Sequence, residues 1–488
     1  MKRILILGSG YISGCLVHFL TRVCATTQKY LVTVASVVPK ELEDLATQFT
    51  NLQTVVINVK EDAEALHDLV GKCDLVVSLL PNDMHLPRLF MYKAAKACID
   101  LRVNMLHASY NSDELIALND DARQNGVLIL GELGLDPGID HLLAMKCIHE
   151  IQEQKGKIVS FVSYCGGLPA PECSGDNYLR YKFSWAPKTA LGNLLNGARF
   201  LENKSVVEIP RGGGILDETK QLHFLPELGL EGYPNRDSLV YLEKYGLSPH
   251  IRTLIRGTLR YTEFSKRVKT LIKVGLLSDD AVDFLDPDVN QAPLTWREFI
   301  ASLLHINLST GNNDANSAFR TVLSPTEIET LTSLGLLEDT AVPKVGTPLT
   351  ALANHLEGML QFKNGEQDVV ILHHELEAKY PMLSSHESVC GRKEFREIDF
   401  IVYGDPLQSN RDSNFNQPIN RTPTTTPHAY SAMAKTVAYT LGIGAEMMLN
   451  GEIKQVGVIL PLTRDIYLPI LERLAHYGLF AIERILNE

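Results

Sequence analysis

The sequence lacks any long hydrophobic run that is free of charged residues. No uncharged apolar run reaches the roughly 18 residues that a transmembrane helix needs. Basic residues are in deficit, with 46 Lys and Arg against 58 Asp and Glu and a net charge of −12. This balance argues against broad electrostatic binding to nucleic acid or to an anionic membrane. A small anionic substrate remains possible, because it needs only a local basic pocket.

Paired cysteines are also missing. None of the eight cysteines belongs to a C-x-x-C pair, and their spacing is irregular. Several lie in apolar patterns, where a free cysteine packs as a small hydrophobic residue. We interpret them as reduced thiols. The chain enters an apolar segment at Lys2–Leu7 without the layout of a signal peptide, so we expect a cytoplasmic protein.

Several catalytic and metal-binding motifs do not occur. The sequence contains no H-E-x-x-H, P-loop or G-x-S-x-G pattern. His373 and His374 are adjacent on a predicted strand, where neighbouring side chains point to opposite faces. They cannot both bind one ion, so we predict no metal site.

Residues 1–131 alternate between short apolar runs and longer amphipathic runs. This rhythm predicts a parallel sheet with helices on both faces, the doubly wound α/β arrangement of a Rossmann dinucleotide-binding domain. The predicted strands are 3–7, 30–37, 54–59, 74–80, 104–108 and 127–130. The predicted helices are 11–22, 40–49, 61–70, 86–98 and 112–125.

The rhythm changes after residue 131. We predict an inserted α+β substrate domain over 132–427, with a helical subdomain at about 240–360 that includes an amphipathic stretch at 251–268. Within this domain, 140–154 reads as a helix, and 157–164, 367–374 and 394–403 read as strands. Residues 404–427 are rich in Asn, Thr and Pro and predict a loop. Amphipathic runs at 429–449 and 465–477 predict helices.

A glycine-rich turn follows the first predicted strand, at Gly8-Ser9-Gly10-Tyr11-Ile12-Ser13. The first glycine allows a tight turn, and the second lets the backbone approach a pyrophosphate at the helix N-terminus. A tight turn that binds nothing is the alternative, but the position of the motif inside a βαβ unit favours the dinucleotide. Ser13 replaces a third glycine and could bond a phosphate.

The end of the second predicted strand bears on the choice of dinucleotide. NAD-binding domains usually carry a carboxylate there, which binds the adenine ribose. Here the strand ends with Ser36 and Val37, and Lys40 follows. Ser36 and Lys40 could instead meet the 2′-phosphate of NADP. The sequence therefore leans weakly to NADP over NAD, although Lys40 could equally be a solvated surface residue.

Polar groups at bends and strand ends form the candidate active site. Tyr110 closes a predicted strand, Asp136 precedes a Pro-Gly turn, and Cys165 precedes two glycines. Each has a plainer interpretation, as core, turn former or buried filler. Asp140 could cap the following helix. Arginines that could bind carboxylates, or simply form surface ion pairs, are Arg236, Arg256 and Arg260.

These segments together resemble the saccharopine reductase family, the glutamate-forming saccharopine dehydrogenases, which also form the dehydrogenase half of aminoadipic semialdehyde synthase. The resemblance covers nearly the whole chain and implies that residues 428–488 form C-terminal helices that return to the Rossmann domain. It rests on the glycine-rich turn, Ser78-Leu79-Leu80-Pro81, Ala108-Ser109-Tyr110, the segments 132–141, 163–171, 179–185, 231–238 and 256–261, and two C-terminal segments at 431–437 and 466–473.

The resemblance implies a reaction and a set of contacts. The reaction is oxidation of saccharopine by NAD(P)+ with hydrolysis to L-glutamate and 2-aminoadipic 6-semialdehyde, in lysine metabolism, by an enzyme that is often a homodimer. The implied substrate contacts are Ser109, Tyr110, Asp136, Arg236, Thr258, Leu259 and Arg260. The implied cofactor contacts are Gly8, Ser9, Gly10, Tyr11, Ile12, Ser13, Ser36, Leu80, Ala108, Ser109, Ser160 and Ser163. Candidates for proton transfer are Tyr110, Asp136 and Cys165.

Two departures from the family pattern and two rival functions remain. Asn82-Asp83 stands where the family commonly has a tyrosine before His85, and Val37 stands where NAD-using members have an aspartate. A dehydrogenase of another imine-linked substrate, such as carboxynorspermidine, would need fewer basic partners than Arg236 and Arg260. A non-catalytic nucleotide-binding sensor would not need Tyr110, Asp136 or Cys165.

Overall fold

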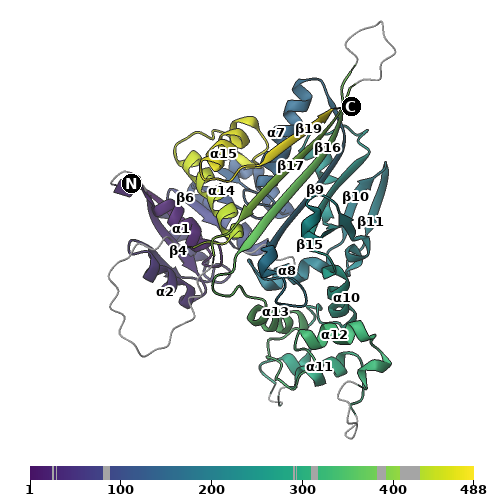
Figure 1. Ribbon diagram of the computed structural model, residues 1–488. Helices are drawn as coiled ribbons and strands as arrows, with labels where there is room; N and C mark the ends of the chain where they lie inside the picture. The colour runs from purple at the N-terminus through teal and green to yellow at the C-terminus, as the bar shows by residue number, and fades with distance from the viewer. Residues whose placement is uncertain are drawn as a thin grey trace.

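The computed structural model describes residues 1–24, 27–28, 30–80, 88–289, 292, 294–308, 317–381, 392–406 and 429–487. The turn at 81–85 and nearly all of the 404–427 segment lie outside the described residues. The chain forms two large sheets joined by helices, with a helical part below them (Figure 1).

The first sheet is parallel and has the order β18-β8-β7-β6-β1-β4-β5. This is the Rossmann order, extended at one edge by a strand from the C-terminal part of the chain. The strands are β1 (Lys2–Leu7), β4 (Tyr30–Ser36), β5 (Gln53–Val56), β6 (Leu75–Ser78), β7 (Asn104–His107), β8 (Leu128–Leu130) and β18 (Gly457–Ile459). A short hairpin, β2 (Val23–Cys24) and β3 (Thr27–Gln28), precedes β4.

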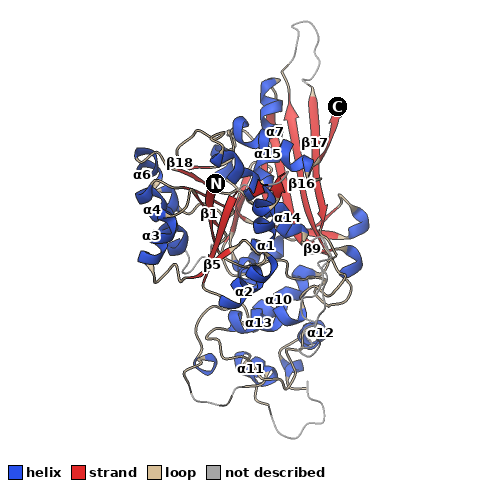
Figure 2. Cartoon of the chain, turned by 90° about the vertical axis from the view of Figure 1, so that its left-hand side faces the viewer, coloured by secondary structure: helices blue, strands red, loops and turns tan. Residues whose placement is uncertain are grey.

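Helices cover both faces of this sheet. Helices α3, α4 and α6 lie on one face, and α1 lies on the other together with α14 (Figure 2). The strand side chains are buried on both faces, as the nearly continuous apolar runs predicted. The helices are α1 (Ser13–Thr21), α2 (Pro39–Gln48), α3 (Ala63–Gly71), α4 (Arg88–Leu101), α5 (Asp113–Ile116) and α6 (Asn119–Gln124).

The second sheet has ten strands and mixed direction. Its main path is β11-β10-β15-β9-β16-β17-β19, in which β15 and β9 are parallel. These strands are β9 (Lys157–Pro169), β10 (Ala198–Glu202), β11 (Ser205–Ile209), β15 (Thr253–Tyr261), β16 (Asp368–Lys379), β17 (Lys393–Tyr403) and β19 (Ile482–Asn487). The branch strands are β12 (Lys220–Leu222), β13 (Leu230–Pro234) and β14 (Arg236–Asp237).

The prediction of a helix over 251–268 is wrong, because Thr253–Tyr261 is the strand β15. Its leucines and arginines repeat at a spacing that also fits a helix. Gly257 shows why a strand forms: a Cβ there would lie 2.4 Å from the Tyr164 ring of the neighbouring strand. The glycine therefore serves close strand packing.

Helices follow β15 and build a core of their own. Trp296, Phe299 and Phe319 are among its fully buried members. Two helices precede β15: α8 (Pro187–Gly192), which packs on α13 in the same core, and α9 (Val240–Lys244), whose Tyr241 belongs to the core between the two sheets. The helices that follow β15 are α10 (Phe264–Val274), α11 (Trp296–Leu303), α12 (Pro325–Ser333) and α13 (Pro348–Met359). Most of them lie at the bottom of Figure 1.

Three helices join the two sheets into one continuous core. They are α7 (Ile139–Glu153), α14 (Ala432–Leu449) and α15 (Arg464–His476). Helix α14 contacts β6 and β7 of the first sheet and β16 and β17 of the second. It also packs closely on α1, since a Cβ on Gly442 would lie 2.2 Å from the Phe19 ring. The second sheet is thus fixed against the first.

The predicted fold class is confirmed: an α/β protein with a Rossmann-type parallel sheet and a second α+β unit inserted before β18. The exact boundaries at 131 and 427 stay a prediction. The C-terminal segment differs from the expectation in one respect, because β19 pairs with β17 of the second sheet. None of the helices within the described residues combines the length and the hydropathy that crossing a membrane requires.

Candidate active site

The glycine-rich turn has the geometry of a phosphate cradle. Gly8 has a φ of +108°, and a Cβ there would lie 3.3 Å from the backbone of Leu79. A Cβ on Gly10 would meet nothing within 4 Å, so this side of the turn is open to a ligand. Helix α1 begins at Ser13 and directs its free N–H groups toward the turn. The residues present therefore fit a dinucleotide pyrophosphate.

Ser13 serves the turn itself. Its hydroxyl lies 2.7 Å from the carbonyl oxygen of Ser9 and 2.8 Å from that of Gly10. A hydroxyl has one proton to donate, and here the backbone receives it. The small residue at this position is thus explained by closure of the turn, to which the Ser13 N–H group also contributes by donating to the Gly10 carbonyl oxygen at 3.0 Å.

The ribose end of the cradle holds a carboxylate that the sequence did not reveal. Val37 is 59% exposed at the end of β4, but Glu41 approaches from the first turn of α2. The Glu41 Oε2 atom lies 2.5 Å from the Ser9 hydroxyl, which is also 2.7 Å from the Ser36 hydroxyl. Lys40, one of the candidates for a 2′-phosphate, pairs with Asp44 at 2.9 Å.

The turn after β8 delivers Asp136 to the carboxyl end of the first sheet. Gly138 has a φ of +149°, and a Cβ there would lie 2.0 Å from the carbonyl oxygen of Gly134. Only glycine fits this bend. The peptide bond between Asp136 and Pro137 is cis. Helix α7 starts at once after the bend and carries Asp140 and His141 in its first turn.

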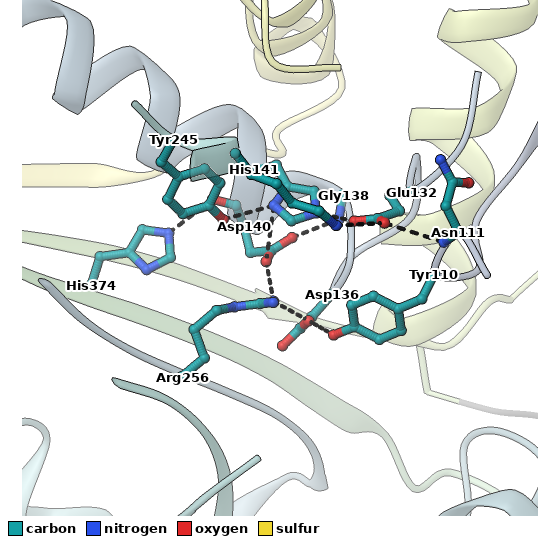
Figure 3. Close-up of polar contacts among 11 residues, drawn as sticks. Tyr110, Asn111, Glu132, Asp136, Gly138, Asp140, His141, Tyr245, Arg256 and His374 are labelled. Carbon is teal, nitrogen blue, oxygen red and sulfur yellow. Dashed lines mark hydrogen bonds and ion pairs between the residues drawn. The ribbon is translucent and has the colours of Figure 1, made fainter. Parts of the chain in front are cut away.

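Asp136 is the centre of a short polar network (Figure 3). The Tyr110 hydroxyl donates to its Oδ1 atom at 2.7 Å. The Arg256 Nη2 group donates to the same oxygen at 2.6 Å. The Asp136 side chain keeps 16% exposure, whereas that of Arg256 has 7%. The carboxylate is therefore both held in place and reachable by a ligand.

A second carboxylate lies behind the first. Asp140 is 1% exposed and also accepts a hydrogen bond from Arg256. Its Oδ1 atom accepts the Gly138 N–H at 2.5 Å, but Gly138 itself is the N-cap residue of α7 and Asp140 lies inside the helix, so the interpretation of Asp140 as the cap is wrong. Burial raises the pKa of Asp140. His374 is hydrogen-bonded to the Asp140 carbonyl oxygen at 3.1 Å, and burial lowers the pKa of His374 to about 3.

Contacts of Glu132 connect the Tyr110 segment to α7 and to α9. Glu132 is fully buried, and its carboxylate lies 2.9 Å from His141 Nε2 and 3.2 Å from Lys244 Nζ. Burial alone would raise the pKa of Glu132, but the bond with His141 and the charge of Lys244 outweigh it and lower the pKa to about 2. Glu132 also accepts the N–H of Asn111, the residue after Tyr110, at 3.2 Å.

The second sheet presents one face to this network. Ser163 of β9 pairs with Arg256 of β15, and Cys165 pairs with Thr258. Arg260 follows at the next position on the same face, because side chains of a strand alternate. On the other side of β9, Ser163 pairs with His374 of β16. The structure thus brings these predicted site residues together.

Three other residues point to the opposite face of this sheet. Ser160 is three positions from Ser163, so the structure does not bring both to one ligand. Leu259 is buried in a cluster with Tyr164 and Leu168, so only its main chain can face a substrate. His373 stacks on Phe224, away from His374, as alternation predicted.

Arg236 and Arg260 are the other two basic residues predicted for the site. Arg236 lies with its guanidinium carbon 4.9 Å from the centre of the Tyr110 ring and donates to Asn193 at 3.2 Å. Arg260 is 6% exposed and stacks on Tyr181 at 4.8 Å. Its Nη1 group donates to a carbonyl oxygen at 2.6 Å, but its buried Nε has no hydrogen-bond partner among the described residues. An anionic ligand would satisfy this donor.

Two of the candidates for proton transfer are held in their protonated forms. Burial, followed by the charge of Asp136, raises the pKa of Tyr110 well above its ordinary value. Burial in the same way raises the pKa of Cys165 far above that of an ordinary thiol. Both groups remain neutral at physiological pH, so neither is a ready base.

Comparison with known families matches this architecture in two parts. Residues 4–130 match the family model described as saccharopine dehydrogenase NADP binding domain. Residues 134–479 match the one described as saccharopine dehydrogenase C-terminal domain. The chain belongs to the saccharopine dehydrogenase family. The resemblance inferred from the sequence motifs is thereby confirmed, and so is the dinucleotide-binding domain, whose matched model is described as NADP binding.

Individual relatives of this family cover the whole chain. Saccharopine dehydrogenase [NADP(+), L-glutamate-forming] from Schizosaccharomyces pombe is 32% identical over 100% of both chains. Apo saccharopine dehydrogenase (L-Glu forming) from Saccharomyces cerevisiae has a TM-score of 0.80 and 30% identity, with 100% of each chain covered. Alpha-aminoadipic semialdehyde synthase from Bos taurus is 39% identical over 98% of this chain. The chain spans 47% of the length of that relative, about half.

Sequence reasoning missed several members of the network. Arg256 was noted as basic, but its bonds to Asp136 and Asp140 were not foreseen. Arg256 lies two and four positions before the predicted contacts Thr258 and Arg260, and this spacing could have revealed that the three side chains share one face of a strand. Glu132 and His141 lay inside a recognised motif without an assigned role. Within the described residues, no group of three or more His, Cys, Asp or Glu side chains has the arrangement of a metal site.

Proposed function

We propose that this chain is an NADP- or NAD-dependent saccharopine dehydrogenase of lysine metabolism. Saccharopine, NAD(P)+ and water would give L-glutamate, 2-aminoadipic 6-semialdehyde, NAD(P)H and a proton. The observation that carries the proposal is the position of Asp136. Its carboxylate lies at the carboxyl end of the dinucleotide-binding sheet, is held by Tyr110 and Arg256, and is flanked by Arg236.

The charges around Asp136 match the charges of saccharopine. This substrate carries three carboxylates and two amino groups. Arg236 and Arg260 offer planar donors to carboxylates, and the buried Nε of Arg260 lacks a partner within the described chain. Asp136 offers an acceptor to an ammonium group. Ser109, Thr258 and the main chain of Leu259 complete the proposed substrate contacts.

The dinucleotide supplies the hydride acceptor when it is bound along Gly8–Ser13, Ser36, Leu80, Ala108 and Ser163. The residues of this chain bind, orient and exchange protons. Because Tyr110 and Cys165 stay protonated, the Asp136 carboxylate is the acceptor that we propose for a proton from the substrate amine, directly or through water. The Tyr110 phenol orients this carboxylate through its hydrogen bond.

The test is absorbance at 340 nm with purified protein, saccharopine, and NADP+ or NAD+ in separate cuvettes. Appearance of the reduced cofactor, with glutamate as a product, is the expected result. A folded protein that binds cofactor yet leaves both cuvettes silent would refute the activity. The same assay with carboxynorspermidine would then examine the rival substrate.

The assignment of Arg236 has a separate test. Arg236→Ala should weaken saccharopine binding by about 2–5 kcal/mol if this side chain anchors a substrate carboxylate. Arg199→Ala is the matched control, since Arg199 is a 48% exposed arginine that pairs with Asp237 nearby. An unchanged KM for saccharopine in the Arg236 variant would overturn the assignment.

We further propose a homodimer in the cytoplasm. Support for the dimer is the last segment, where Phe480, Ile482, Ile485 and Leu486 are 48–58% exposed at one end of the second sheet. Support for a reducing compartment is that Cys15, Cys73, Cys98, Cys147, Cys165 and Cys173 are free thiols. Sedimentation equilibrium and cell fractionation test these two points, and a monomer or an organellar signal would refute them.

A further inference from the structure

The ribose end of the cradle contains a relay of hydrogen bonds that ends on a carboxylate. The Val38 N–H donates to the Ser36 hydroxyl at 3.3 Å, and the Ser36 and Ser9 hydroxyls lie 2.7 Å apart. The Ser9 hydroxyl donates to Glu41 at 2.5 Å. The Ser9 hydroxyl has one proton, so when it donates to Glu41 the contact between the two serines needs the proton of Ser36. Both serines are buried.

The relay lies where the adenine ribose of a dinucleotide belongs. Ser9 stands between the two glycines of the cradle, and Ser36 is the last residue of β4. In a Rossmann domain, the ribose hydroxyls meet a carboxylate at this strand end when NAD is bound. Residue 37 at this place is a valine. Glu41 reaches the same point from the first turn of α2, one helical turn further along the chain.

The local charge is opposite to what a 2′-phosphate requires. Arginine or lysine side chains usually receive that phosphate. Lys40 pairs with Asp44, with its side chain 76% exposed. No lysine or arginine of the described chain forms an ion pair with Glu41, whose side chain accepts a hydrogen bond from Ser9. A phosphate placed beside Ser9 and Ser36 would meet an unneutralised carboxylate.

We propose that Glu41 determines the cofactor specificity of this chain. Its carboxylate accepts hydrogen bonds from the adenine-ribose hydroxyls of NAD(H) and disfavours the 2′-phosphate of NADP(H). The chain thus keeps the domain of its NADP-binding relatives, with a ribose site that accepts NAD(H). The proposal rests on the proposed dinucleotide-dependent function, and it adds the residue that selects between the two cofactors.

The experiment measures Kd for NADH and NADPH by nucleotide fluorescence, without saccharopine, for the parent, Glu41→Gln and Asp44→Asn. Glu41→Gln should tighten NADPH relative to NADH by about tenfold or more, a difference near 1.4 kcal/mol. Asp44→Asn, which removes the same charge one turn away and also releases Lys40, should shift this ratio by less than about threefold. The ratio of kcat/KM for the two cofactors should follow the ratio of Kd.

Three results would overturn the proposal. They are an unchanged ratio of the two Kd values in Glu41→Gln, an equal shift in Asp44→Asn, and no binding of either nucleotide by the parent. The last would also remove the dinucleotide function itself. A shifted Kd ratio in a protein that does not turn over saccharopine would support the role of Glu41 while refuting the proposed reaction, so the two failures are distinguishable.

Discussion

Replacing Arg256 by leucine should lower the free energy of unfolding more than replacing a surface arginine, because Arg256 bonds two carboxylates in the protein interior. The Arg256 side chain is 7% exposed, and it bonds both Asp136 and Asp140. Its guanidinium carbon lies 4.2 Å from the centre of the Tyr241 ring. Leucine would leave Asp140, which is 1% exposed, as a buried carboxylate with only the His141 Nδ1 atom, at 3.6 Å, as a basic partner among the described residues. Removing one partner of a buried pair typically costs about 3–5 kcal/mol.

The assay is equilibrium unfolding in urea, followed by tryptophan fluorescence and circular dichroism to check that one transition is observed. Arg252→Leu is the matched control, because Arg252 is 43% exposed and pairs with Glu377. Its loss should cost less than about 1 kcal/mol. Asp140→Asn removes the carboxylate charge that Arg256→Leu would leave uncompensated, and it keeps an oxygen that can accept the Gly138 N–H.

The double variant Arg256→Leu/Asp140→Asn completes the cycle. Asparagine at position 140 removes the charge that leucine at position 256 leaves uncompensated. The double variant should therefore lose about 2 kcal/mol less stability than the sum of the two single losses. Strict additivity, or a loss in Arg256→Leu no larger than in Arg252→Leu, would refute the argument that Arg256 neutralises a buried carboxylate.

Three further changes have defined outcomes. Asp136→Asn should lower kcat/KM for saccharopine at least about 100-fold while leaving the Kd of NADPH unchanged, since the carboxylate is assigned to proton transfer; a parallel loss of cofactor affinity would mean that it is misplaced. Burial lowers the pKa of His374 to about 3 in the folded protein, so between pH 6.5 and pH 3 the unfolded chain binds a proton that the folded chain does not. The free energy of unfolding should therefore fall as the pH drops through this range. His374→Gln should reduce the slope of unfolding free energy against pH by up to about 1.4 kcal/mol per pH unit in acid unfolding curves. Gly442→Ala places a Cβ 2.2 Å from the Phe19 ring and should destabilise the protein by about 1–3 kcal/mol in urea. Gly358→Ala, at a helical glycine of α13 whose Cβ would meet no atom within 4 Å, should leave the stability unchanged or raise it by less than about 1 kcal/mol; equal effects of the two changes would argue against close packing of α14 on α1.

The parts of the fold that follow from local patterns could be predicted. Buried parallel strands are apolar throughout and their covering helices are amphipathic, so most strands and helices of the first 131 residues were predicted to within a few residues. The single helix predicted over 112–125 is instead two short helices, α5 and α6, and the hairpin of β2 and β3 was not predicted. The stretch 253–261 was misread because leucines and arginines that alternate irregularly fit a helical period as well as a strand. Its strand state depends on pairing with β9 and β13, which are distant in the sequence.

The site could be predicted only as a set of motifs. Tyr110, Asp136 and Arg236 were identified, but not the bonds among them. Arg256 and Asp136 are separated by 120 positions, so their contact depends on how the second sheet packs on the first. Glu41 escaped notice for a similar reason: a residue in the first turn of a helix was not expected to serve the end of the preceding strand.

The segment between β8 and α7 explains why the site needs both sheets. It leaves the dinucleotide-binding sheet, makes the Gly138 bend, and enters a helix that packs under the second sheet. Asp136 and Asp140 flank this bend, and one guanidinium from β15 holds both. Any shift of the second sheet against the first would therefore break the bonds that orient Asp136. In the proposed function, the same polar contacts that stabilise the junction would set the distance between a dinucleotide on the first sheet and a substrate on the second, which is the quantity that hydride transfer requires to be fixed.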